Sequence, residues 1–317
     1  MKYKSEELKT SYFYAEKIMH EKAVSFYQAF SKLSENRFYS VCAVYAFCRY
    51  VDDLVDGFDN DNLKPKEKEN VLKELQDIED CIQKLEKENK MQNLDYPWWL
   101  SFEDTFLTYR MKAEPFCWQI QGQRCDLDFK EIQTIEELIE YSKLVAGSVG
   151  YMLLPILVNE TNNWDINLVN ACVNLGIGMQ ITNILRDVGE DLTKRKRVYL
   201  PQELLKNYQL GIEDLRRFCN NFTLNYETTS FKHFINLWEE LTTVSKKYYE
   251  SLEPYIMDFE KTCRLPLAAA SKIYQSIEQA VRDERYDCFT KRCYTNKKLR
   301  NTILVQVLNT LNNKTRG

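Results

Sequence analysis

The sequence predicts an all-α protein folded as a single domain, on three observations. The 317 residues include only 9 glycines and 7 prolines, and few helix breakers favour long helices over strands and turns. Apolar residues recur at three- and four-residue spacing along most of the chain, which is the period of an amphipathic helix. No repeat and no low-complexity linker divides the chain. We therefore expect one domain over residues 1–317, built from about ten helices.

The N-terminal third is expected to contain three helices. The first spans Ser11–Ser31, and the second, Asn36–Asp56, is apolar on nearly every side and so should be buried. A loop over Gly57–Pro65 follows, with Gly57 placed to end the helix. Glu67–Lys90 is rich in Lys and Glu and keeps its apolar residues on one face, which predicts an outer helix with a solvated charged surface.

The middle of the chain continues helically. Pro97 and Pro115 mark the boundaries of the next two helices. Thr134–Leu157 is predicted to form a further helix that contains a patch of small residues. Asn167–Asp187 is predicted to form another apolar helix, and two glycines leave one side of it without side chains.

The last third begins with a basic loop. This loop, Lys194–Pro201, is followed by helices over Gln202–Arg285 and by a basic tail from Lys291. The longest apolar stretch, Leu144–Val158, is interrupted by glycines and a proline and is shorter than the roughly 20 apolar residues of a spanning helix. We expect no transmembrane segment, whereas a peripheral contact with lipid is compatible with the sequence.

Composition excludes several functions. The net charge of −4 offers no basic field for nucleic acid. The ten cysteines form no Cys-x-x-Cys pair, and the two histidines, His20 and His233, lie far apart in sequence, which argues against zinc sites and Ser-His-Asp triads. The N-terminus has no apolar secretory segment, so free thiols in the cytoplasm are expected. The residues do not indicate an oligomeric state.

Two acidic stripes carry the functional prediction. Tyr45, Arg49, Asp52 and Asp56 fall at i, i+4, i+7 and i+11, on one face of an otherwise apolar helix. Burying carboxylates is unfavourable unless they are paired or bind a metal. Taken alone, the stripe is also compatible with a helix end whose acids face solvent.

The second stripe repeats this arrangement. Gln180, Asn183, Asp187 and Asp191 fall at i, i+3, i+7 and i+11, and all four offer the oxygen ligands that Mg²⁺ prefers. Two such stripes suggest the facing halves of one magnesium site. Basic residues close to the stripes in sequence are suited to recognise a diphosphate. They are Arg49, Arg186, Arg195, Lys196 and Arg197. The expected chemistry is ionisation of an allylic diphosphate beside a water-free apolar cavity.

Four segments resemble the squalene and phytoene synthases, in that family's order and spacing, over about residues 11–300. They are Tyr45-Ala-Phe-Cys-Arg49-Tyr-Val-Asp52-Asp53-Leu-Val-Asp56, Val145-Ala-Gly-Ser-Val-Gly150-Tyr-Met, Asn183-Ile-Leu-Arg186-Asp187-Val-Gly-Glu-Asp191 and Arg197-Val-Tyr199-Leu-Pro201. The resemblance implies an isoprenoid synthase fold, a helical bundle around a central apolar cavity. It also implies that two allylic diphosphates condense to a cyclopropylcarbinyl diphosphate. That intermediate ionises and gives a conjugated triene by proton loss, or squalene by hydride from NADPH.

The resemblance assigns roles position by position. Metal binding, to several Mg²⁺ ions, falls to Asp52, Asp56, Asn183, Asp187 and Asp191. Substrate contact falls to Ser25, Phe26, Phe30, Tyr45, Arg49, Gln180, Asn183, Arg186, Tyr199, Tyr274 and Arg292. Tyr141 is implied to lie near the reacting carbons and, with Arg186 and the four acids, counts as catalytic. For Tyr45, Tyr141 and Tyr274, packing in the core is the alternative.

Two departures qualify the match. Relatives carry a Ser-Lys-Ser-Phe segment where this chain has Ala23-Val24-Ser25-Phe26, so the lysine is missing, and Lys22 is the candidate to replace it. Asp53 makes the first motif read as in chain-elongating prenyltransferases, but the second motif does not fit that class.

Substrate length is predicted from Phe26 and Phe30, which share one helical face. In the family this helix lines the prenyl tunnel, and C40-forming enzymes have a smaller residue where Phe30 stands. A ring there indicates two farnesyl diphosphates (C15) and the product dehydrosqualene (4,4'-diapophytoene), in carotenoid biosynthesis. For Phe30 itself, packing in the core is the alternative. The alternatives are a phytoene synthase, an NADPH-dependent squalene synthase and, remotely, a non-enzymatic helical scaffold.

Overall fold

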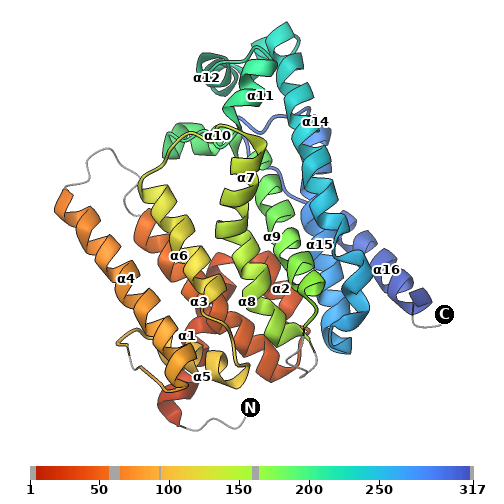
Figure 1. Cartoon of the computed structure of the whole chain (residues 1–317). Helices are drawn as coiled ribbons and strands as arrows, with labels where there is room; N and C mark the ends of the chain where they lie inside the picture. Colours follow the sequence, from red (N-terminus) through yellow and green to blue (C-terminus); the bar gives the residue numbers. More distant parts are fainter. Residues whose placement is uncertain (1–4, 57–64, 93, 159–163, 315–317) are drawn as a thin grey trace.

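The chain folds into a bundle of helices, which confirms the all-α prediction (Figure 1). The computed structural model describes residues 5–56, 65–92, 94–158 and 164–314. Within those ranges no strand forms, and the single β contact is an isolated antiparallel bridge between Val158 and Phe259. Sixteen α-helical segments occur in the described ranges, more than the ten expected, because backbone breaks and short turns divide several of the predicted helices.

The N-terminal part holds the first six helices. Their bounds are α1 Glu6–Lys22, α2 Val24–Phe30, α3 Glu35–Asp56, α4 Pro65–Glu88, α5 Trp99–Thr108 and α6 Glu114–Leu127. The predicted first helix, Ser11–Ser31, is wrong in two respects. Helix α1 already begins at Glu6, and non-helical backbone at Ala23 (φ −136°, ψ 57°) divides the predicted helix into α1 and α2. The break redirects α2 towards α15, which it contacts. Residues 57–64 of the predicted loop lie outside the description, and Pro65 already begins α4.

The central part holds the helices that surround the core. They are α7 Ile135–Ser142, the π-helical turn η1 Lys143–Gly147, α8 Ser148–Leu157, α9 Ile166–Arg186, α10 Val188–Glu190 and the π-helical turn η2 Asp191–Arg195. The first three run on without interruption, as predicted for Thr134–Leu157, with Thr134 as N-cap. The predicted basic loop starts later than expected, because Lys194 and Arg195 belong to η2 and the helix ends at Lys196 (φ 54°).

The C-terminal part completes the bundle. It consists of α11 Gln202–Asn207, α12 Ile212–Asn220, α13 Phe222–Asn225, α14 Thr229–Glu250, the 3₁₀ turn η3 Glu253–Asp258, α15 Lys261–Asp283 and α16 Lys297–Lys314. The sequence predicted only a basic tail where α16 forms. This helix packs against α15 through Ile303 and Val307, one turn apart and both buried.

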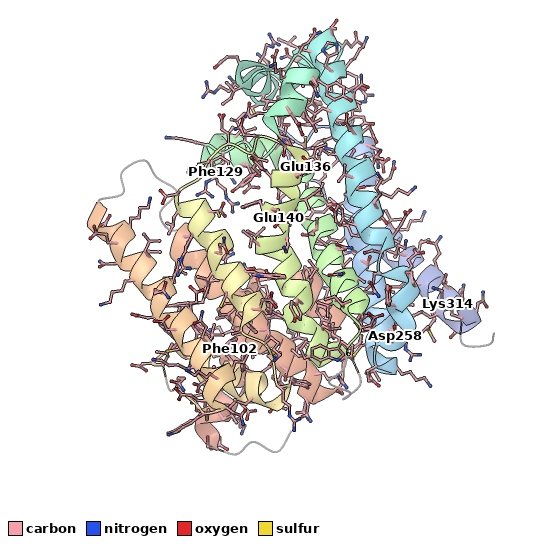
Figure 2. All side chains as sticks on the ribbon, viewed as in Figure 1. Phe102, Phe129, Glu136, Glu140, Asp258 and Lys314 are labelled. Carbon is pink, nitrogen blue, oxygen red and sulfur yellow. The ribbon has the colours of Figure 1, made fainter. Side chains whose placement is uncertain are left out.

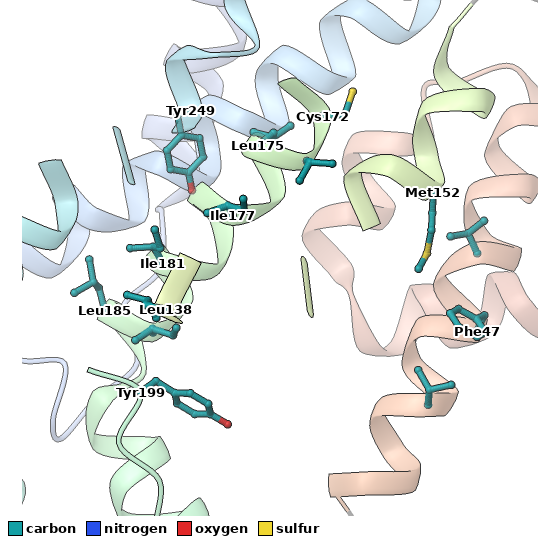
Figure 3. Packing of buried hydrophobic residues seen from close by; sticks show 14 of the residues in the cluster. Phe47, Leu138, Met152, Cys172, Leu175, Ile177, Ile181, Leu185, Tyr199 and Tyr249 are labelled. Atoms are coloured by element: carbon teal, nitrogen blue, oxygen red, sulfur yellow. The ribbon is translucent and has the colours of Figure 1, made fainter. Parts of the chain in front are cut away.

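Helix α9 lies at the centre and is covered by α8, α14 and α15. Figure 3 shows Leu175, Ile177, Ile181 and Leu185 along α9, with Tyr249 of α14 beside them. By length and composition α9 could cross a membrane, and it is the one described helix that meets this criterion. Most of its residues are buried inside the protein, which is the behaviour of a core helix.

Two glycines let α9 approach η1 and α8 until the backbones touch. A Cβ atom on Gly150 of α8 would lie 2.0 Å from the carbonyl oxygen of Cys172. One on Gly176 of α9 would lie 2.1 Å from the carbonyl oxygen of Ala146. Such distances leave no room for a side chain, so α9 packs this closely against η1 and α8 only because both positions are glycine.

Candidate active site

Two adjoining cavities lie among α3, α6, α8, α9 and α15. The first, of about 350 Å³, has a largely apolar lining that includes Phe26, Phe30 and Phe259. The second, of about 230 Å³, is polar. Five residues line both cavities, so the two meet, and these are Asp52, Gln119, Val145, Gln180 and Asn183. The combination suits a molecule with a charged head and an apolar tail.

A larger groove, of about 560 Å³, lies elsewhere, between α15 and α16. Its lining contains a single acid, Glu253, which is paired with Lys272 at 2.8 Å. The groove therefore offers no set of convergent charged groups, and we place the candidate site in the adjoining pair.

The first acidic stripe reaches the junction of the two cavities at Asp52. Arg49 donates from Nη1 to Asp52 at 3.1 Å and also pairs with Asp53. Gln123 of α6 donates from Nε2 to the other oxygen of Asp52 at 3.3 Å. These contacts fix the carboxylate where both cavities meet. The side chain of Asp56, predicted to bind metal, lies outside the described residues.

The second stripe brings Asp187 and Asp191 to the polar cavity. Arg186 donates two hydrogen bonds to Asp187, the one from Nε at 2.7 Å. Arg292 donates to the same carboxylate at 3.1 Å and lies 3.8 Å from Glu190. Both arginines therefore line the cavity through their contacts with its acids.

Two consecutive hydrogen bonds connect this stripe to α15. The Tyr274 hydroxyl donates to Asn183 Oδ1 at 2.5 Å, and Asn183 Nδ2 donates to Gln180 Oε1 at 3.2 Å. All three residues line the apolar cavity, and both amides also line the polar one. Tyr45 faces the apolar cavity, where burial raises the pKa of its hydroxyl to about 12, so the phenol stays neutral.

Phe26 and Phe30 of α2, predicted to contact substrate, both line the apolar cavity. Phe26 stacks on Phe30 with ring centroids 6.0 Å apart and lies 6.0 Å from the ring of Tyr274. Nothing is described for the side chain of Ser25. Val24, which stands where relatives have lysine, is exposed.

Asp126 of α6 is a largely buried acid of the polar cavity, with 13% of its side chain exposed, that the sequence interpretation missed. The Tyr141 and Tyr199 hydroxyls donate to it at 3.0 and 3.3 Å, and Arg197 Nη1 lies 3.6 Å away. Burial raises the pKa of Asp126 to about 6, while the nearby Arg197 opposes that rise. The two tyrosine rings stack with centroids 5.2 Å apart, so Asp126 fixes both.

A signal for Asp126 was present in the sequence. Gln119, Gln123 and Asp126 fall at i, i+4 and i+7 on one face of α6, so this helix carries a third polar stripe with the same period as the other two. Arg197, predicted to face diphosphate, instead donates to the Asp126 carbonyl at 2.8 Å, and neither it nor Lys196 lines the two cavities.

The polar cavity has the charge and the donors of a cation site. It is lined by five carboxylates and three guanidinium groups, a formal charge of −2, from Asp52, Asp126, Asp187, Glu190, Asp191, Arg186, Arg195 and Arg292. In the described part of the chain no three His, Cys, Asp or Glu side chains converge on one point. Oxygen donors spread over separate helices fit Mg²⁺, which takes few protein ligands and completes its shell with water and phosphate.

Replacing Asp191 by Asn is expected to stabilise the fold at neutral and higher pH. Burial, with repulsion from Asp187 and Glu190, raises the pKa of Asp191 to about 7, although Arg195 opposes the rise. This value exceeds the ordinary 3.8, so the folded protein holds the proton more tightly than the unfolded chain. Wild-type stability therefore falls as pH rises from about 4 to about 7, and Asn removes that ionisation.

Thermal unfolding at about pH 5 and about pH 8 measures this effect. The gain of the Asp191→Asn variant over wild type should be larger at the higher pH. A gain that is equal at both values, or a loss at the higher one, would contradict the electrostatic interpretation.

Comparison with known proteins agrees with this geometry. Residues 19–298 match the family model for squalene/phytoene synthase. The chain is 32% identical over 279 residues to a chloroplastic phytoene synthase of Daucus carota, covering 87% of this chain and 65% of that protein. It is 31% identical over 280 residues to 15-cis-phytoene synthase of Synechococcus elongatus, covering 86% of this chain and 84% of that one.

Solved structures show the same fold. A dehydrosqualene synthase in complex with a ligand superposes with a TM-score of 0.81 at 31% identity, over 97% of this chain and 99% of that chain. YisP of Bacillus subtilis superposes at 0.71 with 21% identity, over 95% and 97% of the two chains, which shows the fold alone. With the matched segment spanning most of the chain and both acidic stripes meeting at one cavity, this chain belongs to the squalene/phytoene synthase family.

Proposed function

We propose that the chain condenses two farnesyl diphosphates head to head, with Mg²⁺, to dehydrosqualene through a cyclopropylcarbinyl diphosphate. The family consists of head-to-head prenyl synthases, and the substrate length is the proposal. One observation carries it: an acidic cavity joins an apolar cavity whose lining includes the buried ring of Phe30.

The polar cavity supplies the means to ionise a diphosphate. Bound Mg²⁺ would act as a Lewis acid that takes up the negative charge of the leaving group. The residues placed to hold it are Asp52, Asn183, Asp187 and Asp191, with Asp56 by resemblance. Arg186 and Arg292 lie beside Asp187 and would donate to diphosphate oxygens. The cavity is net acidic, so a diphosphate is expected to bind well only together with cations.

The apolar cavity supplies protection for the carbocation. Its aliphatic and aromatic lining leaves few groups that could hold water near the reacting carbons. Tyr45, Phe26 and Tyr274 present rings whose faces attract positive charge. Tyr141, held by Asp126, lines the polar cavity with Gln180 and would lie beside the diphosphate end of a bound substrate.

The comparisons point to two chain lengths. The curated relatives named above are phytoene synthases, whereas the structure at TM-score 0.81 is a dehydrosqualene synthase, and identity is near 31% in each case. A phytoene synthase is therefore the second candidate. Phe30 favours the C15 substrate, because a ring of which only 2% is exposed occupies the cavity wall that a longer chain would meet.

Incubation with farnesyl or geranylgeranyl diphosphate tests the proposal directly. Each reaction is run with and without Mg²⁺ and with and without NADPH, and the hydrocarbon is identified by mass. Dehydrosqualene from the C15 substrate, formed only with Mg²⁺, is the expected result. Faster turnover of the C20 substrate would favour a phytoene synthase, and squalene formed only with NADPH would indicate a squalene synthase. No diphosphate release at all would remove the enzymatic assignment.

Replacing Phe30 by Ala is expected to raise the ratio of C40 to C30 product by about tenfold or more, since selectivity between chain lengths rests on steric fit. Removing the ring deepens the apolar cavity by the space it fills. Competition between the two diphosphates, followed by mass analysis, measures the ratio. Phe106→Ala is the matched control, because Phe106 is equally buried (2% exposed) and lines neither cavity. An unchanged ratio in the Phe30 variant would refute the chain-length argument.

A further inference from the structure

The C-terminal segment carries a charge opposite to the rest of the chain. Residues 288–317 contain seven Lys and Arg and no Asp or Glu. Since the whole chain has a net charge of −4, the preceding 287 residues carry −11. Within the described residues most of this segment forms α16, which lies on the flank of the bundle beyond α15 (Figure 2). Four of these seven cations belong to α16, namely Lys297, Lys298, Arg300 and Lys314.

Helix α16 is apolar on two sides, and only one is covered. Ile303 and Val307 face α15 and are buried. Leu304, Val305 and Leu308 lie at i, i+1 and i+4 on another side and are 39%, 60% and 44% exposed. Tyr294, just before the helix, is 64% exposed. Four of the eleven large exposed apolar side chains found in the described residues therefore fall within one short segment.

Charge and apolar surface coincide on this side. Lys297 precedes Leu304 and Leu308 by seven and eleven residues, so it lies on the same side of the helix as these leucines. Lys298 precedes Val305 by seven residues and lies on the same side as that valine. Both lysines are exposed. We call the side formed by these five residues the outer face of α16. Cations combined with exposed aliphatic groups are typical of helices that lie in the interface of an anionic membrane.

We propose that the outer face of α16 binds the surface of a bilayer that contains anionic phospholipid. The lysines contact the headgroups, and the aliphatic side chains enter the boundary with the acyl chains. Nucleic acid would match the charge but would leave the apolar groups exposed to water. A second copy docked through the same face would bring two positive segments together. The proposal does not depend on which hydrocarbon the enzyme forms.

Vesicle cosedimentation of the full chain tests the proposal. Vesicles of phosphatidylcholine containing phosphatidylglycerol should bind the protein about tenfold or more tightly than phosphatidylcholine alone, and raising the salt concentration should weaken that binding. Lys297→Glu with Lys298→Glu, or Val305→Glu with Leu308→Glu, should each abolish the difference. Leu224→Glu is the matched control, because Leu224 on α13 is 75% exposed and should bind as wild type does.

Two further measurements separate binding from folding and from other partners. Turnover in detergent solution and the circular dichroism of the helices should be unchanged in all three variants, because the substituted positions lie outside both cavities. Equal binding to neutral and anionic vesicles, or retention of binding in both glutamate pairs, would overturn the proposal. It would also be overturned if duplex DNA competed away all vesicle binding, or if sedimentation showed a dimer that the glutamate pairs dissociate.

Discussion

Asp52→Ala is expected to lower turnover of prenyl diphosphate by about a thousandfold or more, while the fold is retained. Asp52 lies at the junction of the two cavities, where the diphosphate and the first prenyl carbon would meet. Its loss removes an oxygen donor from the proposed cation site. The fold should survive, because the Asp52 side chain is 39% exposed and Arg49 keeps its pairing with Asp53.

Steady-state rates and circular dichroism, measured over a range of Mg²⁺ concentrations, check this expectation. Asp77→Ala on the exposed side of α4 is the control and should retain wild-type rates. Near-normal activity of the Asp52 variant with a normal helical spectrum would show that the metal assignment is wrong.

At the second motif, Asp187→Asn is a better variant than Asp187→Ala, because alanine would leave the buried Arg186 without its carboxylate partner.

Gly176→Val is expected to destabilise the protein by about 3 kcal/mol or more, or to prevent folding. The first atom of any side chain there would lie 2.1 Å from the Ala146 carbonyl oxygen and 2.7 Å from Cα of Gly147. These neighbours are backbone atoms, so no rotamer change can relieve the overlap. Relief would require α9 to move away from η1, along a helix that is central to the core.

Urea unfolding of Gly176→Ala, Gly176→Val and wild type gives the free energies. Gly211→Ala is the control, because the nearest atom to a Cβ at Gly211 is 3.8 Å away, and its stability should change by less than about 1 kcal/mol. If the alanine variant at position 176 unfolded at the wild-type urea concentration, the backbone contact described above would be incorrect.

The periodic spacing of apolar residues predicted the positions of several long helices. The buried α3 and α9 and the amphipathic α4 begin and end within a few residues of their expected positions, because apolar spacing determines them. The division at Ala23 was not predictable in that way, since alanine and valine are compatible with a continuous helix. It follows instead from the contact between α2 and α15, which is a tertiary interaction.

The candidate site was predictable to a similar extent. Asp52, Asp187 and Asp191 were found because carboxylates stand out on apolar helices. Asp126 was missed because α6 shows little contrast between its faces and because its partners, Tyr141 and Tyr199, are distant in sequence. Only the folded chain shows that this carboxylate fixes the two tyrosine rings.

The close packing of α9 against η1 and α8 limits how the apolar cavity could change its size. Gly150 and Gly176 both line the apolar cavity, so that part of its wall is main chain rather than side chain. No substitution of these glycines can widen the apolar cavity, and almost any would disrupt the packing of the bundle. Another part of the lining, with Phe26 and Phe30 on the short helix α2, consists of replaceable side chains. Divergence in product length, natural or engineered, should therefore accumulate on α2 and leave the glycine wall unchanged.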